Sequence, residues 1–151
     1  MPPPRKPSTI DGDAPAYRLE RQIGYLLRRA HQRASAIFMA RFAGHGLTPT
    51  QFAALAKIGD EDEVSQNHLG RLTAMDPATM KGVIGRLHAR SLIASKPDAT
   101  DRRRTLWRLT ESGAHTLAQA LPAGAQTTEE TLAPLDEEER RVFLELLSRL
   151  V

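Results

Sequence analysis

The chain has 151 residues, a formal net charge of +3 and 40% hydrophobic residues, a size and composition that predict one domain with a single core. It contains no cysteine, which excludes disulfide bonds, thiolate metal sites and thiol-based redox switches. The sequence has neither an apolar run near the roughly 18 residues of a membrane span nor the core of a signal peptide, so we expect a cytoplasmic protein without membrane contact.

The N-terminal part divides into a proline-rich segment and a long helix. Residues 1–15 hold five of the ten prolines, a composition that predicts a flexible tail. From Leu19 to Phe42 apolar side chains recur every three or four residues, which predicts one amphipathic helix. The Gly44-His45-Gly46 segment is expected to end this helix.

Capping signals mark the starts of the next helices. Thr48-Pro49-Thr50-Gln51 supplies an N-cap, a proline for the first turn, and a glutamine that returns a hydrogen bond to the cap. Ser65 is predicted to cap a short helix that follows an acidic loop at residues 60–63. Asp76-Pro77 repeats the cap-and-proline signature, so a tight turn is expected between the short helix and the next one.

The helix after Asp76 has two different faces. Its apolar positions follow the spacing of one buried stripe: Met80, Val83, Ile84 and Leu87. Its other face, left toward solvent, carries Thr79, Lys81, Gly82 and Arg86. Two helices joined by a tight turn, with a basic face on the second, predict a DNA-binding helix-turn-helix.

After Ser91 the pattern changes to two short strands with a charged connection. We predict strands over residues 92–96 and 105–109, with Asp101-Arg102-Arg103-Arg104 at the tip of the hairpin, or wing. Residues 65–110 hold nine Lys or Arg against three Asp. A basic helix and a basic hairpin offer two probes of different shape to double-stranded DNA, whose two grooves differ in width.

The C-terminal part is predicted to be helical. Thr110 opens a helix that Pro122 is expected to kink or split. Asp136 and Glu139 form a capping pair for a last helix, whose apolar stripe is Val142, Phe143, Leu146, Leu147 and Leu150. The first and last helices have more apolar surface than one small domain covers, so we expect a core shared between two chains in a homodimer.

Five segments, taken with their order and spacing, carry a family resemblance: residues 46–52, 69–72, 76–79, 86–93 and 101–113. From about Leu19 onward the chain resembles the MarR (multiple-antibiotic-resistance) regulators, which are dimeric winged-helix transcription factors. The resemblance implies a mainly α fold with a small β-wing. It also implies a dimerisation helix over 16–46, a winged helix-turn-helix lobe over 47–110, and C-terminal dimerisation helices over 111–151.

The function implied by the resemblance is that of a ligand-responsive repressor. Such a homodimer binds a pseudo-palindromic operator and is released by a small effector. The chain departs from the family pattern at three positions. Ser91 stands where glycine usually ends the helix before the wing, so it must accept an awkward backbone conformation or end the helix differently. Gly82 replaces a common base-contacting arginine, and Gly85 adds a second glycine to the same helix.

The predicted DNA contacts lie on the recognition helix and the wing. Lys81 is expected to reach guanine or phosphate, Arg86 a phosphate, and Thr79 a base edge or methyl group. The alternative is an ordinary solvated helix face.

At the tip of the wing, Asp101 is expected to pair with Arg103 and hold it extended toward the minor groove. Arg102 and Arg104 would then lie beside the phosphates. The alternative for these four residues is a mobile charged loop.

The resemblance places an effector pocket between the first helix and the winged lobe. The candidate residues are Arg28, His31, Ser35 and Phe38; the arginine would bind a carboxylate, and His31 and Ser35 a hydroxyl or carbonyl. Surface ion pairs and a partner-facing histidine are the alternatives. Residues 23–31 also resemble a branch of the family that senses aromatic acids or their coenzyme A thioesters.

Enzyme chemistry has little support in the sequence. The five histidines are scattered, with no zinc-ligand spacing, no glycine-rich phosphate loop and no nucleophile elbow. We therefore expect no catalytic residue, no cofactor and no metal. The competing hypothesis of another class is a winged-helix interaction module that binds protein or RNA.

Overall fold

The computed structural model describes residues 17–151, so the predicted flexible tail at 1–15 lies outside the described residues. The elements are η1 (Leu19–Arg21), α1 (Ile23–Arg41), α2 (Pro49–Glu61), β1 (Val64–Ser65), α3 (Gln66–Leu72), α4 (Pro77–Ala89), β2 (Ile93–Pro97), β3 (Thr105–Leu109), α5 (Glu111–Thr131) and α6 (Glu137–Ser148). The fold is mainly helical with one small antiparallel sheet, as predicted. Among residues 17–151, no helix combines the length and apolarity needed to cross a membrane.

The helix starts confirm the capping signals. Thr48 and Gln51 form a reciprocal capping box at the start of α2, and Asp136 and Glu139 form one at the start of α6. Each box satisfies two backbone amides that a helix start leaves without a partner. Sequence patterns three or four residues long are therefore sufficient to place these helix starts.

The first helix starts later than expected. The prediction of one helix from Leu19 is wrong, because Gln22 is extended, with φ −78° and ψ 129°. Its side chain accepts the Tyr25 amide at 2.8 Å and thus acts as the N-cap of α1, and only a short 3-10 turn precedes it. The apolar periodicity continues across this break, so periodicity alone does not reveal it.

The sheet joins the wing to the helix-turn-helix in the strand order β1-β3-β2. Both pairings are antiparallel, and Trp107 of β3 lies opposite Val64 on one side and Ser95 on the other. The predicted β2–β3 hairpin is confirmed. Strand β1 was not predicted, because two residues are too few to show an alternating pattern.

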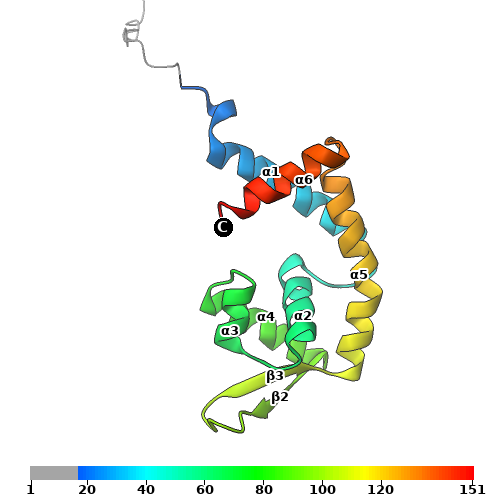
Figure 1. Cartoon of the computed structure of the whole chain (residues 1–151). Helices are drawn as coiled ribbons and strands as arrows, with labels where there is room; N and C mark the ends of the chain where they lie inside the picture. Colours follow the sequence, from blue (N-terminus) through cyan, green and yellow to red (C-terminus); the bar gives the residue numbers. More distant parts are fainter. Residues whose placement is uncertain (1–16) are drawn as a thin grey trace, which may run out of the picture.

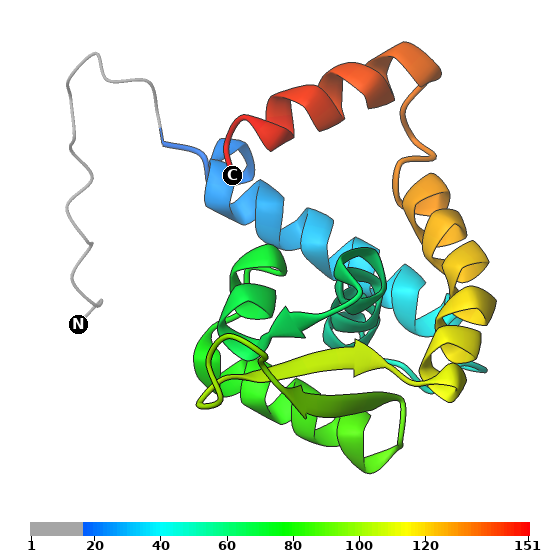
Figure 2. The same ribbon diagram turned by 60° about the horizontal axis from the view of Figure 1, so that its bottom comes forward.

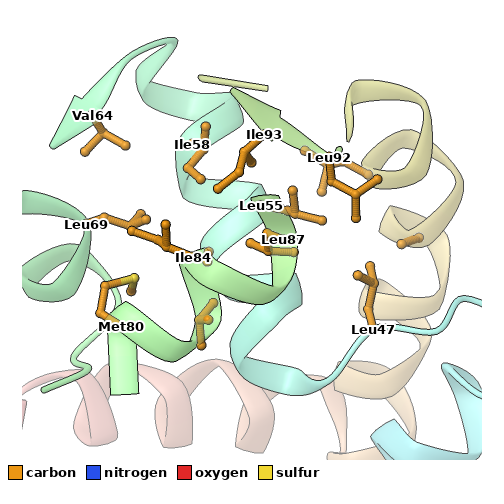
Figure 3. Packing of buried hydrophobic residues seen from close by; sticks show 14 of the residues in the cluster. Leu47, Leu55, Ile58, Val64, Leu69, Met80, Ile84, Leu87, Leu92 and Ile93 are labelled. Carbon is orange, nitrogen blue, oxygen red and sulfur yellow. The ribbon is translucent and has the colours of Figure 1, made fainter. Parts of the chain in front are cut away.

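The core of the lower part in Figure 1 is built from α2, α3, α4 and the sheet (Figure 3). The largest fully buried side chains are Leu55, Ile58, Leu69, Met80, Leu87, Ile93 and Val83. Because the apolar stripe of α4 is buried, its opposite face with Lys81 and Arg86 is exposed, as predicted. We call residues 47–110 the lobe.

The end of α4 confirms the predicted strain at Ser91, which has φ 57°. This left-handed conformation lets the amide of Leu92 return to the carbonyl of Leu87 at 3.1 Å. The hydroxyl of Thr110 donates to the Ser91 carbonyl at 2.6 Å. The surrounding structure therefore holds a conformation that glycine adopts more easily.

Helix α5 runs unbroken past Pro122, so of the two expected outcomes, a kink or a split, the split is wrong. Proline removes one amide and clashes with the preceding turn, which usually interrupts a helix. Here Ala120 and Ala123 are buried on either side of it, and their packing holds the helix together. Tertiary contacts thus outweigh the local preference.

The terminal helices form a second part, which we call the body: residues 17–46 and 111–151. Helix α1 packs against α5, and Arg33 donates to the carbonyls of Glu130 at 2.9 Å and Thr131 at 3.2 Å. Helix α6 turns back toward the start of α1 (Figures 1 and 2) and has no buried residue. Large apolar side chains are exposed along these helices: Ile23, Leu26, Leu27, Val142, Phe143, Leu144, Leu146 and Leu150.

Candidate DNA-binding site

The start of the recognition helix α4 is held by Asp76. Its carboxylate accepts the hydroxyl of Thr79 at 2.6 Å and the backbone amide of Thr79 at 2.9 Å. These two bonds, the hydroxyl first, hold the pKa of Asp76 below its ordinary value. The Thr79 hydroxyl therefore helps to cap the helix, and the expected contact of Thr79 with a base edge or methyl group stays a prediction.

The exposed face of α4 carries basic side chains and glycines. Arg86 lies over Gly82, since a Cβ at residue 82 would be 3.4 Å from its Nη1 atom. A Cβ at Gly85 would meet no heavy atom within 4 Å. Lys81 and Arg86 are thus the long side chains that this part of the helix directs to solvent, as expected for contacts with phosphates or guanines.

The tip of the wing differs from the predicted ion pair. The Asp101 carboxylate accepts the backbone amide of Arg103 at 3.0 Å, and the Asp101 carbonyl accepts the amide of Arg104 at 2.9 Å. Within residues 17–151 no hydrogen bond or ion pair holds the Arg103 guanidinium. An aspartate at a turn lies closest to the amide two residues on, so it shapes the backbone and leaves the guanidinium free.

Arg104 connects the wing to the helix-turn-helix. Its guanidinium lies 3.8 Å from the Asp98 carboxylate and 3.5 Å from the Ser65 hydroxyl, which caps α3. Asp98 also accepts the amide of Thr100 at 2.9 Å and its hydroxyl at 2.8 Å. One aspartate thus organises the loop and orients the arginine, so Arg104 is less free than a residue of a mobile charged loop.

A groove of about 460 Å³ separates α3 from the wing. Its lining is Ser65, Gln66, Asn67, Arg71, Arg103, Arg104, Thr105 and Trp107. Arginines from two different elements line the same open groove, an arrangement that suits a nucleic-acid backbone. The sequence analysis did not single out Arg71, although the signal was present: a basic residue on the first helix of a predicted helix-turn-helix.

The wing is expected to loosen in acid. The bonds from Thr100, and then the positive charge of Arg104, lower the pKa of Asp98. The resulting stabilisation is complete above the ordinary aspartate pKa of about 4 and is lost as the pH falls through the lowered pKa. In an NMR titration the Thr100 amide should shift with a midpoint below the ordinary aspartate value. A midpoint at or above that value would contradict this account of the loop.

Comparisons with known proteins agree with this geometry. Residues 45–104 match a MarR family model. The HTH-type transcriptional repressor NicR of Pseudomonas putida is 39% identical over 145 residues, which cover 96% of this chain and 92% of NicR. The chain belongs to the MarR family. Its relatives are transcriptional regulators, so this MarR-family protein is a regulator and not an enzyme.

Solved structures show the same winged-helix fold. A probable transcriptional regulator from Pseudomonas aeruginosa has a TM-score of 0.86 and 46% identity, covering 89% of this chain and 100% of its own. BpsR of Bordetella bronchiseptica has a TM-score of 0.87 and 38% identity, covering 90% and 97%. The BpsR structure concerns regulation of its DNA binding by 6-hydroxynicotinic acid.

In this MarR-family chain the four candidate effector residues all lie on α1 but have different surroundings. His31 and Ser35 are adjacent, with 3.4 Å between Nε2 and Oγ, and Arg28 is exposed. Phe38 is buried and stacks on Phe42 with ring centroids 3.8 Å apart. His31 also lines an apolar groove of about 400 Å³ between α1, α5 and α6, which the other three candidates do not line.

Proposed function

We propose that this MarR-family regulator is a repressor that binds a pseudo-palindromic operator as a homodimer. A small aromatic carboxylate, or its coenzyme A thioester, would release it. The observation that carries the proposal is the pairing of two basic elements in one lobe: α4 with Lys81 and Arg86, and the wing with Arg103 at its tip. A helix suits the major groove, and an extended arginine suits the narrower minor groove.

The proposal assigns dimerisation to the body. Helices α1 and α6 leave a continuous set of apolar side chains uncovered, and a groove between them is lined by Ile23, Leu27, Phe143, Leu146, Leu147, Arg149 and Leu150. Apolar surface of this extent marks an association site. A second copy is the occupant that suits it best, because a twofold dimer pairs the two lobes with the two halves of a palindrome.

Two relatives support repression and the effector class. NicR is named as a repressor, and BpsR is regulated by 6-hydroxynicotinic acid, a hydroxylated pyridine carboxylate. In this chain, Arg28 offers an exposed guanidinium for a carboxylate, while His31 and Ser35 offer polar groups for a ring substituent. A ligand acting on α1 would change the separation of the two recognition helices.

The direct test is a gel-shift titration with the DNA upstream of the protein's own gene. We expect one dimer per duplex, with an affinity that falls steeply as salt is raised. Adding 6-hydroxynicotinic acid should release the DNA, with benzoate and an aromatic coenzyme A thioester as comparisons. Absence of any retarded duplex at low salt with micromolar dimer would remove the repressor proposal. Binding to single-stranded RNA alone would favour an interaction module instead.

A further inference from the structure

The lobe and the body are joined by few elements. Their relative orientation is therefore set by the contacts between them. The chain passes from body to lobe after α1 and returns at the start of α5 (Figure 1). Helix α4 packs against α2, α3 and β2, whereas α1 packs against α5. The recognition helix and α1 are therefore joined mainly through α2 and α5, which pack against each other.

One side chain links the ends of these two helices. Arg90, directly after α4, donates from Nη1 to the carbonyl of Gly46 at 2.7 Å. Gly46 lies in the loop after α1 and has φ 63°, a left-handed conformation that glycine adopts without strain. The backbone amide of Arg90 also bonds to the carbonyls of Arg86 and His88 and closes the end of α4. The same residue thus ends the recognition helix and connects it to the body.

Aromatic packing also crosses this junction. Phe52 of α2 packs closely on Gly124 of α5, where a Cβ would lie 2.7 Å from the phenylalanine ring. Phe52 also meets Phe42 of the body edge-on, with ring centroids 4.8 Å apart, so aromatic packing holds the two parts together. Within residues 17–151, no other side-chain hydrogen bond or ion pair joins α4 or its C-cap to the body. A charged donor on a carbonyl sets both a distance and a direction.

We propose that Arg90 is a positioning residue for operator recognition: its bond to Gly46 sets the angle of α4 relative to α1. In a homodimer this angle determines the separation of the two recognition helices, which must match half-sites about one helical turn, or roughly 34 Å, apart. The inference rests on the proposed function, because it requires two lobes bound to one operator. If Arg90 has this role, the protein discriminates between operators that differ in the spacing of their half-sites, and the effect is not limited to overall affinity.

The test compares wild type with Arg90→Met, which keeps the length of the side chain and removes its donors. Each protein is titrated against the operator duplex and against duplexes with one base pair added or removed between the half-sites. Wild type should lose at least about tenfold in affinity on the altered duplexes. Arg90→Met should lose no more than about threefold, because its lobes are free to pivot, while its melting temperature and dimer mass stay unchanged.

Two matched variants separate positioning from general loosening. Arg90→Lys retains a cationic donor, so it should recover part of the affinity loss that wild type shows on duplexes with altered half-site spacing. Arg41→Met removes an exposed ion pair with Glu130, and both residues belong to the body. This variant should therefore lose as much affinity on the altered duplexes as wild type does. An equal relaxation in Arg41→Met would overturn the role of Arg90.

The outcomes also distinguish this inference from the proposed function. If wild type binds no duplex as a dimer, the proposed function fails, and the inference fails with it. If wild type discriminates between spacings and Arg90→Met discriminates equally well, only the inference about Arg90 is overturned.

Discussion

Replacing Arg103 by alanine is expected to lower operator affinity by at least about tenfold, which corresponds to roughly 1.4 kcal/mol. The Arg103 guanidinium is exposed at the tip of the wing, with its backbone shaped by Asp101 and its side chain free for DNA. An arginine in the narrow minor groove meets a strongly negative potential, so its loss removes both charge and shape readout. Fluorescence anisotropy across a salt series should also give a slope reduced by about one.

The Asp101→Asn variant tests how the wing is built. Asparagine keeps an Oδ1 acceptor for the amide of Arg103 but removes the negative charge. If the turn is what matters, Asp101→Asn binds the operator like wild type, whereas Asp101→Ala weakens binding. A loss with asparagine as large as that with alanine would restore the ion pair expected from the sequence. Normal operator binding by Arg103→Ala would exclude the wing tip from the mechanism.

Replacing Gly113 by alanine is expected to destabilise the fold by about 3 kcal/mol. A Cβ at this position would lie 1.8 Å from the carbonyl oxygen of Leu92, which accepts the amide of Thr110 at 3.1 Å. The clash is with backbone at the base of the wing, so no side chain can rotate away to relieve it. Intrinsic helix propensity favours alanine by about 1 kcal/mol, and the clash outweighs it. The urea midpoint should therefore fall clearly.

Gly85→Ala is the matched control for helix propensity. It also lies inside a helix, but a Cβ there meets no heavy atom of the chain within 4 Å. Its urea midpoint should stay unchanged or rise. The corresponding gain in free energy of unfolding is at most about 1 kcal/mol. Equal midpoints for Gly113→Ala and wild type would show that the base of the wing yields easily, contrary to the close packing found here.

The helix-turn-helix and its wing were predictable because their signals are local. The cap-and-proline pairs at Thr48 and Asp76, and the change from helical to strand spacing after Ser91, depend only on near neighbours. The strain at Ser91 was also predictable, because one position at a helix end requires a left-handed backbone. The sequence predicted helix starts and interruptions less accurately. The side chain of Gln22 caps α1 and delays its start, and buried neighbours let α5 continue through Pro122.

The partners of the polar side chains depended on the tertiary structure. Asp101 accepts a backbone amide, Thr79 bonds to its own helix cap, and Arg71 shares a groove with the wing. Sequence spacing does not determine which of these partners a side chain binds, because a long or flexible side chain can reach several groups.

The sequence by itself determined which residues are apolar, which ends are capped and where positive charge gathers, and hence a winged helix-turn-helix with uncovered terminal helices. Those properties follow from periodicity and local hydrogen bonding, which act over a few residues. Only the tertiary structure brought Arg90 to Gly46, 44 residues away along the chain, and Gly113 against Leu92. Contacts of this kind exist only once helices and strands have packed, because packing alone sets the distances between residues remote in sequence.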